Sequence, residues 1–178
     1  MADEAVLICL LILPFAGCLV GAFIPSNKRN LEAWFAGTIA GAGLILAWLS
    51  YPTIADGAVI RTTFEWLPSL GVNFTLRMDG FAWLFAVLLS GIGFLFVVYA
   101  RYYMSPADPL ARFFSLLLGF MGAMLGIVLS GNLIQIVFFW ELTSVFSFLV
   151  IGYWHHCAKA RDGARMALIV TASGGFSL

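Results

Sequence analysis

Long apolar stretches divide this sequence into segments of membrane-spanning length. A helix of about 20 mostly apolar residues is long enough to cross a bilayer. Five such predicted spans cover residues 5–24, 31–51, 81–99, 110–130 and 133–154. A sixth apolar stretch starts at residue 163 and is truncated at Leu178. The pattern predicts an all-α membrane protein, a polytopic transmembrane helix bundle, and we expect residues 1–178 to be the N-terminal part of one larger transmembrane domain.

One long connection, residues 52–79, follows a different pattern. Residues 61–66 and 72–77 alternate between apolar and polar positions on either side of Pro68 and Gly71. Two runs of period two around a Pro/Gly turn are typical of a β-hairpin. We therefore expect a short external hairpin that caps one end of the bundle.

Composition supports a lipid environment. Hydrophobic residues make up 62% of the chain and charged residues 10%, and the mean hydropathy is +1.01. A soluble domain of this size could not bury so much apolar surface. The formal net charge is zero, so nothing favours nucleic acid as a partner. The lipid bilayer is the expected surrounding.

The basic residues predict the orientation of the chain in the membrane. Seven of the nine lie in or at the edges of the connections after the first, third and fifth predicted spans: Lys28, Arg29, Arg101, Arg112, Lys159, Arg161 and Arg165. Basic residues concentrate in cytoplasmic loops. We expect residues 155–165 to form an inside loop and the acidic N-terminus to lie outside.

Glu141 is the strongest candidate for chemistry. We interpret it as the only charged side chain inside the long apolar segments, about 12 Å from one end of its predicted helix and about 20 Å from the other. A charge at that depth costs about 2.5 kcal/mol or more and usually serves ion or proton movement. A purely structural role, in which Glu141 ties helices together by hydrogen bonds of about 0.6 kcal/mol each, is the alternative.

Polar residues near Glu141 are candidates for a proton path or for supporting it. They are Asn132, Gln135, Thr143, Ser144 and Ser147. Their side chains can hold water or bond to neighbouring helices inside an apolar segment. The same region offers nothing for metal or hydrolytic chemistry, because the adjacent residues at 155–157 do not share a helix face and no other ligand cluster occurs. We predict no cofactor and no metal.

Several longer motifs resemble one known family. Residues 138–144 read FFWELTS and residues 149–154 read LVIGYW; further matches are RMDG at 77–80, YARYY at 99–103, FMGAMLG at 120–126 and SGNLIQ at 130–135. Together they resemble the antiporter-like membrane subunits shared by respiratory complex I and the multi-subunit Mrp-type cation/proton antiporters. The WELTS form is most similar to the large MrpA-type subunit of the Mrp antiporters, which are also called Mnh or Pha.

This resemblance implies a secondary transporter subunit rather than an enzyme. It implies exchange of Na⁺ or K⁺ for protons, a larger bundle with inverted repeats, and a Lys two helices after Glu141 that pairs with it. It also implies a hetero-oligomer with small hydrophobic subunits in the inner membrane of a bacterial cell. His156 and Lys159 are candidates for proton uptake by location alone.

Two other functions stay open at this point. One is a proton-pumping membrane subunit of NADH:quinone oxidoreductase, the complex I relative. The other is an assembly scaffold that translocates nothing, in which Glu141 is structural.

Overall fold

The computed structural model describes residues 2–24, 29–67, 72–104, 110–153 and 158–176. The helices are α1 (Ala2–Ala22), α2 (Arg29–Leu49), α3 (Tyr51–Ala55), α4 (Gly80–Tyr103), α5 (Leu110–Leu129), α6 (Leu133–Ile151) and α7 (Ala158–Phe176), and the strands are β1 (Ile60–Leu67) and β2 (Val72–Met78). Within these ranges, five helices are long and apolar enough to cross a membrane. The predicted helix bundle with five complete spans is confirmed.

The boundaries of two predicted elements were wrong. Helix α7, which corresponds to the predicted sixth span, starts at Ala158 rather than at residue 163. Residues 158–165 are therefore helical and not part of a loop. Residues 51–55 form the short helix α3, with Pro52 in its first turn, where the missing N–H of proline costs no hydrogen bond. The charged residues of 158–165 hid the start of α7, because a helix end accommodates charge more readily than the middle of an apolar span.

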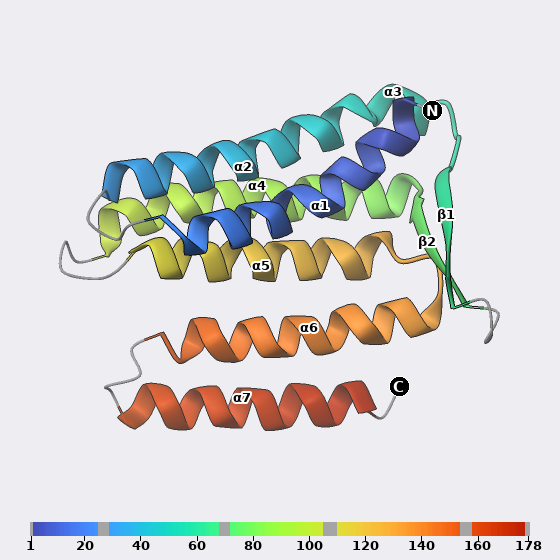
Figure 1. The fold of residues 1–178 in the computed structure, drawn as a ribbon. Coiled ribbons are helices and arrows are strands. Elements are labelled where there is room, and N and C mark those ends of the chain that lie inside the picture. Colours follow the sequence, from blue (N-terminus) through green and yellow to red (C-terminus); the bar gives the residue numbers. More distant parts are fainter. Residues whose placement is uncertain (1, 25–28, 68–71, 105–109, 154–157, 177–178) are drawn as a thin grey trace.

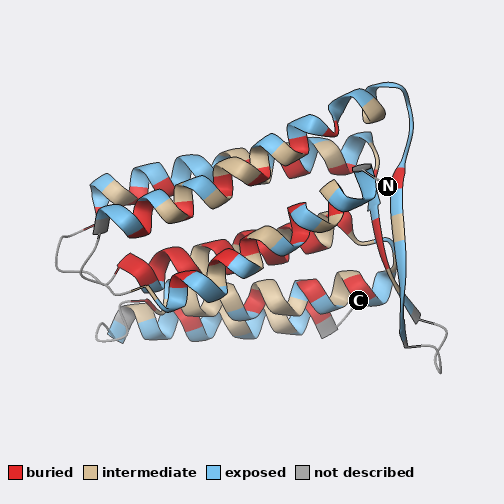
Figure 2. Cartoon of the chain, turned by 45° about the horizontal axis from the view of Figure 1, so that its top comes forward, coloured by how far each residue is buried: buried red, intermediate tan, exposed pale blue. Residues whose placement is uncertain are grey.

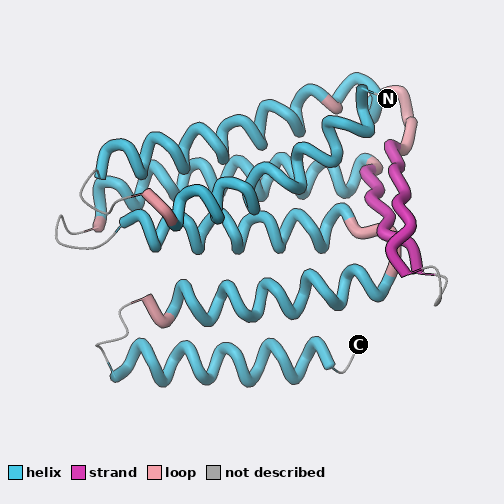
Figure 3. The backbone as a smooth tube through the Cα atoms, in the orientation of Figure 1, coloured by secondary structure: helices cyan, strands magenta, loops and turns pink. Residues whose placement is uncertain are grey.

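Successive long helices run up and down between two ends of the bundle. The N-terminus, the hairpin and the α5–α6 connection lie together at one end, which we call the hairpin end, whereas α2, α5 and α7 begin at the opposite end (Figure 1). Helix α5 packs against α1 and α6, α2 packs against α4, and α6 packs against α7. Figure 3 shows the two strands crossing the hairpin end of the helices.

Helix α5 forms the centre of the described bundle. In α5, 61% of the most apolar 18-residue segment is buried, whereas the corresponding share is 17–33% in the other four spanning helices. Figure 2 shows buried positions along the length of α5. Glycines on α5 leave space for aromatic rings of neighbouring helices: Gly119 lies against Phe146, and Gly126 lies against Phe139. The small residues therefore serve packing within this chain, as glycines do in membrane bundles.

The predicted hairpin is confirmed. Strands β1 and β2 pair antiparallel, with Thr63 opposite Thr75 and Ile60 opposite Met78. The hairpin is joined to the helices at the α5–α6 connection, where the Gly131 N–H donates to the Thr75 carbonyl over 2.8 Å. A side chain at position 131 would collide with Thr75, so this approach needs glycine.

Replacing Gly126 should destabilise the bundle. In Gly126→Ala the new methyl group overlaps the ring of Phe139, which is 4% exposed and has little room to move. Overpacking of this kind costs about 1–3 kcal/mol. Thermal unfolding of the full-length protein in detergent should show a lower Tm than wild type.

Gly91→Ala is the matched control. Its methyl group would lie 3.9 Å from Leu44, an ordinary contact distance. Equal Tm values for the two variants would contradict the role of the Gly126–Phe139 contact.

Candidate functional site

The helix that carries Glu141 starts at a polar cap. Asn132 is the N-cap of α6, and its Oδ1 accepts a hydrogen bond from the Gln135 N–H over 2.8 Å. This satisfies one of the N–H groups that a helix start leaves without a partner. The Asn132 amide also donates to the Asn73 carbonyl on β2 over 2.7 Å. Asn132 thus fixes the start of α6 and ties it to the hairpin.

Gln135 makes a second tie between α6 and the hairpin. Its side chain is fully buried, and its Oε1 accepts from the Thr75 N–H over 3.0 Å. Its Nε2 is buried without an acceptor among the residues that the structure describes. Gln135 lies six residues before Glu141, about 9 Å along the helix axis. It sets the position of α6 without touching the carboxyl.

Glu141 lies near the middle of α6 and faces α7. The side chain is half-buried, its Oε1 atom is buried, and no hydrogen-bond donor of the described ranges reaches that oxygen. On α7, a Cβ atom at Gly175 would overlap the Glu141 carboxyl. A carboxyl in this place can hold a proton, or can accept a basic group or water that reaches it between the helices.

The other predicted polar residues on α6 lie elsewhere. Thr143 and Ser144 both donate to the Trp140 carbonyl, over 2.7 and 3.2 Å, a local bond that satisfies a hydroxyl within its own helix. Ser147 lines a mostly apolar cavity of about 270 Å³ between α4, α5 and α6. None of these hydroxyls is hydrogen-bonded to Glu141 in the described ranges, and a proton path through them stays a prediction.

The two candidates for proton uptake are not placed in detail. His156 lies outside the described residues. Lys159 is in the first turn of α7, but its side chain is also outside the described part.

A second carboxylate inside the bundle was missed. Glu32 lies in the first turn of α2 and is 2% exposed, close to Phe35 and Ser115. The interpretation of Glu141 as the only charged side chain in an apolar segment was therefore wrong. Glu32 lies at the edge of its predicted span, where a charge normally reaches the headgroup region, but the structure buries it beside residues of α1 and α5.

Gly175 was also missed as a site residue. The sequence shows it as one of two adjacent glycines in the apolar stretch that follows residue 163. Gly174, its neighbour, has open space where a Cβ atom would lie. The two glycines look equivalent in sequence, and only the α6–α7 packing distinguishes them.

Comparisons with known proteins come from sequence and from structure. Residues 66–114 match the family model described as NADH-ubiquinone oxidoreductase (complex I), chain 5 N-terminus. A probable A/B subunit of a K⁺/H⁺ antiporter of Rhizobium meliloti is 55% identical over 98% of this chain. The A subunit of the Na⁺/H⁺ antiporter of Alkalihalophilus pseudofirmus is 41% identical over 94% of it.

Solved structures agree with the sequence relatives. A chain in the structure of the Mrp complex from Dietzia sp. DQ12-45-1b superposes with a TM-score of 0.81 at 26% identity, covering 95% of this chain and 18% of that one. A chain of the membrane-bound sulfane sulfur reductase, an archaeal respiratory membrane complex, gives a TM-score of 0.77 at 19% identity over 97% of this chain and 35% of that one, a likeness of fold alone. The resemblance stated from the sequence motifs is confirmed.

The chain is shorter than the proteins it matches. It spans 18% of the Rhizobium meliloti relative and 21% of the Alkalihalophilus pseudofirmus relative. The similarity therefore concerns one part of a larger membrane subunit.

Removing the Gln135 acceptor should loosen the hairpin from α6. In Gln135→Met the Thr75 N–H loses its partner, which costs about 1–3 kcal/mol for a buried donor. Hydrogen–deuterium exchange of the full-length protein should become about 5- to 150-fold faster at Thr75. Thr143→Val, which removes a hydroxyl bonded only within α6, is the control; equal protection of Thr75 in wild type and Gln135→Met would refute the tie.

Proposed function

We propose that this chain is the N-terminal part of a subunit of a monovalent cation/proton antiporter, and that Glu141 takes up and releases the transported proton. The observation that carries the proposal is the buried Oε1 of Glu141 at the α6–α7 contact, near the middle of a spanning helix. The names of the similar proteins, antiporters of K⁺ or Na⁺ against H⁺, support the class of transport.

The chemistry follows from the cost of a buried charge. A protonated Glu141 is neutral and is stable next to the α7 backbone, whereas the ionised form needs a cation or water beside it. The approach or departure of a positive charge therefore decides whether the carboxyl holds its proton. The family resemblance implies that a Lys two helices later provides that charge, and movement of this Lys would couple the proton to Na⁺ or K⁺.

The rest of the site holds Glu141 in place. Asn132 and Gln135 fix the start of α6 against β2, and Gly175 lets α7 approach the carboxyl. Neither group of contacts requires these residues to carry protons. We therefore propose that Asn132, Gln135 and Gly175 position Glu141, and that Glu141 alone among them takes up and releases the proton.

The assembly and location follow from the same relatives. We propose that the protein works in a bacterial inner membrane as part of a hetero-oligomer with small hydrophobic subunits, since the Dietzia structure is of an Mrp complex. The acidic N-terminus, together with the hairpin, would face outside.

One observation favours a second function. The family model that matches residues 66–114 describes a complex I subunit, so a proton-pumping subunit of NADH:quinone oxidoreductase is the alternative. Cation-dependent proton exchange without a redox substrate distinguishes the antiporter from it.

Removing the charge of Glu141 should stop transport but not assembly. In the full-length assembled complex, Glu141→Gln keeps the size of the side chain but cannot exchange a proton. Fluorescence quenching by a pH dye in inverted vesicles should show no Na⁺- or K⁺-dependent proton movement.

The control for this experiment is Glu65→Gln, an exposed carboxylate on β1. It should retain wild-type exchange. Normal exchange in Glu141→Gln, or loss of the assembled complex, would instead indicate a structural role for Glu141.

A methyl group at position 175 should disturb the same carboxyl from the other helix. Gly175→Ala places its Cβ atom on the Glu141 carboxyl, which must turn away. Misplacement of a reacting group by about 1 Å can reduce a rate about 100-fold, and we expect a reduction of about 10- to 100-fold in exchange. Gly174→Ala, in open space, should transport like wild type, and equal activities of the two variants would argue against the contact of Gly175 with Glu141.

A further inference from the structure

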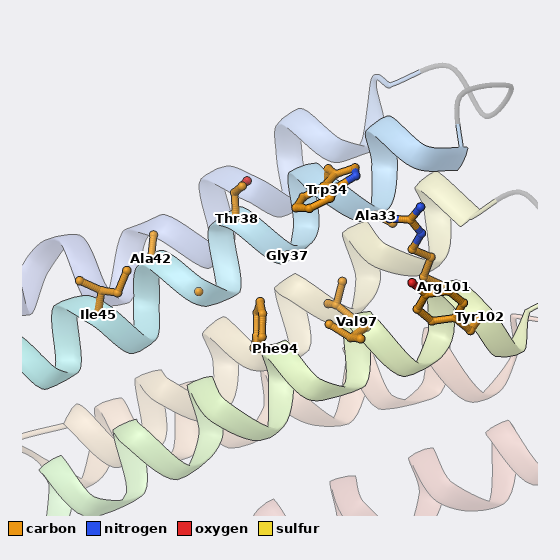
Figure 4. Close-up of a pocket in the computed structure, with 12 residues that line it drawn as sticks. Ala33, Trp34, Gly37, Thr38, Ala42, Ile45, Phe94, Val97, Arg101 and Tyr102 are labelled. Carbon is orange, nitrogen blue, oxygen red and sulfur yellow. The ribbon is translucent and has the colours of Figure 1, made fainter.

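A groove runs between α2 and α4 on the side of the bundle away from Glu141. Its volume is about 510 Å³, and the side chains around it are almost all apolar (Figure 4). Small residues of α2, including Gly37, Gly41 and Ala42, form one wall, and Phe94 and Val97 of α4 form the other. These small residues leave a hollow between the larger α2 side chains Trp34 and Ile45.

Polar contacts hold the two helices together beyond each end of the groove. Toward the hairpin end, the Trp83 indole N–H donates to the Ala47 carbonyl over 2.7 Å. At the opposite end, the Arg101 guanidinium donates to Asn30 Oδ1 over 3.0 Å. The two helices are therefore hydrogen-bonded to each other near both ends of the groove.

The length of the groove matches one leaflet of a bilayer. On α2 it extends from Ala33 to Ile45, and that stretch of helix rises about 18 Å. The hydrocarbon core of a bilayer is about 30 Å thick. The groove therefore covers slightly more than half of the thickness of the core. One end of the groove lies at Arg101, in the last turn of α4, which is the level at which the acyl chain of a lipid would start.

A positive charge lies at the end of the groove farther from the hairpin. The Arg101 guanidinium lies 5.9 Å from the centre of the Trp34 ring and 5.6 Å from that of the Tyr102 ring. Trp and Tyr gather at the level of the lipid headgroups, and an Arg guanidinium recognises phosphate with several N–H donors in one plane. Figure 4 shows these three side chains together at one end and Ile45 at the other.

We propose that this groove binds one anionic phospholipid of the leaflet nearest Arg101. One acyl chain lies along Gly37 and Gly41, and the phosphate is bound by Arg101 between the two aromatic rings. A helix of another subunit fits less well, because a helix is about 10–12 Å wide, whereas α2 and α4 approach so closely that a Cβ atom at Gly41 would lie 3.7 Å from Phe94. The Arg101 charge complements a phosphate and does not complement an apolar helix.

Lipid retention in the full-length assembled complex tests the proposal. The complex would be purified from nanodiscs of equal parts phosphatidylglycerol and phosphatidylcholine, and retained lipids counted by native mass spectrometry. Wild type should retain phosphatidylglycerol preferentially. Arg101→Gln should reduce that preference about fivefold, the effect of one basic residue at an anionic surface.

Arg112→Gln is the matched control, because Arg112 is an exposed cation in the first turn of α5 and does not line the groove. It should keep the wild-type preference. A preference unchanged in Arg101→Gln, or reduced equally in both variants, would overturn the proposal.

A second pair of variants tests the groove rather than the charge. Gly41→Leu fills the space and should reduce retention of the tightly held lipid whatever its headgroup, with an unchanged elution volume of the complex. Thr38→Cys places a cysteine at the groove; its efficient cross-linking to another subunit would show that a protein helix occupies the site and would also overturn the proposal.

Discussion

The packing of α5 against α1 and α6 is the contact on which the rest of this structure depends. In lipid, apolar side chains gain little by leaving the solvent, so close packing must hold the helices together. The glycines of α5 provide it by admitting the rings of Phe139 and Phe146 from α6. Without these spaces α6 could not approach the centre of the bundle, and Glu141 would not have a defined depth or direction.

A second constraint acts at the hairpin end. The backbone of β2 bonds to Gly131 and to the side chains of Asn132 and Gln135. These bonds hold the connection between the end of α5 and the start of α6. They also give hydrogen-bond partners to polar groups whose burial without a partner would cost free energy near an apolar bundle. The hairpin is therefore a structural part of the proposed proton site, although it lies about 9 Å or more from the carboxyl along α6.

The two sides of the bundle are suited to different ligands. On the α6–α7 side, one buried carboxyl oxygen faces the backbone at Gly175, which suits a proton. On the α2–α4 side, an apolar groove ends at a guanidinium between two aromatic rings, which suits an anionic lipid. Central α5 separates these two regions, so a change in lipid binding and a change in proton transfer can be measured independently.

Much of the fold could be predicted from local pattern. Apolar runs of spanning length predicted the bundle, and the alternating residues 61–66 and 72–77 predicted the hairpin, because bilayer thickness and backbone hydrogen bonding leave few alternatives. The motifs, including the one around Glu141, carried the family resemblance. Tertiary structure alone decided which polar groups share a site. It buried Glu32 at a helix end, assigned Asn132 and Gln135 to the hairpin, and placed Gly175 rather than Gly174 beside Glu141. The physical reason is that hydropathy and periodicity act along one helix, whereas these contacts depend on the rotation and register of neighbouring helices.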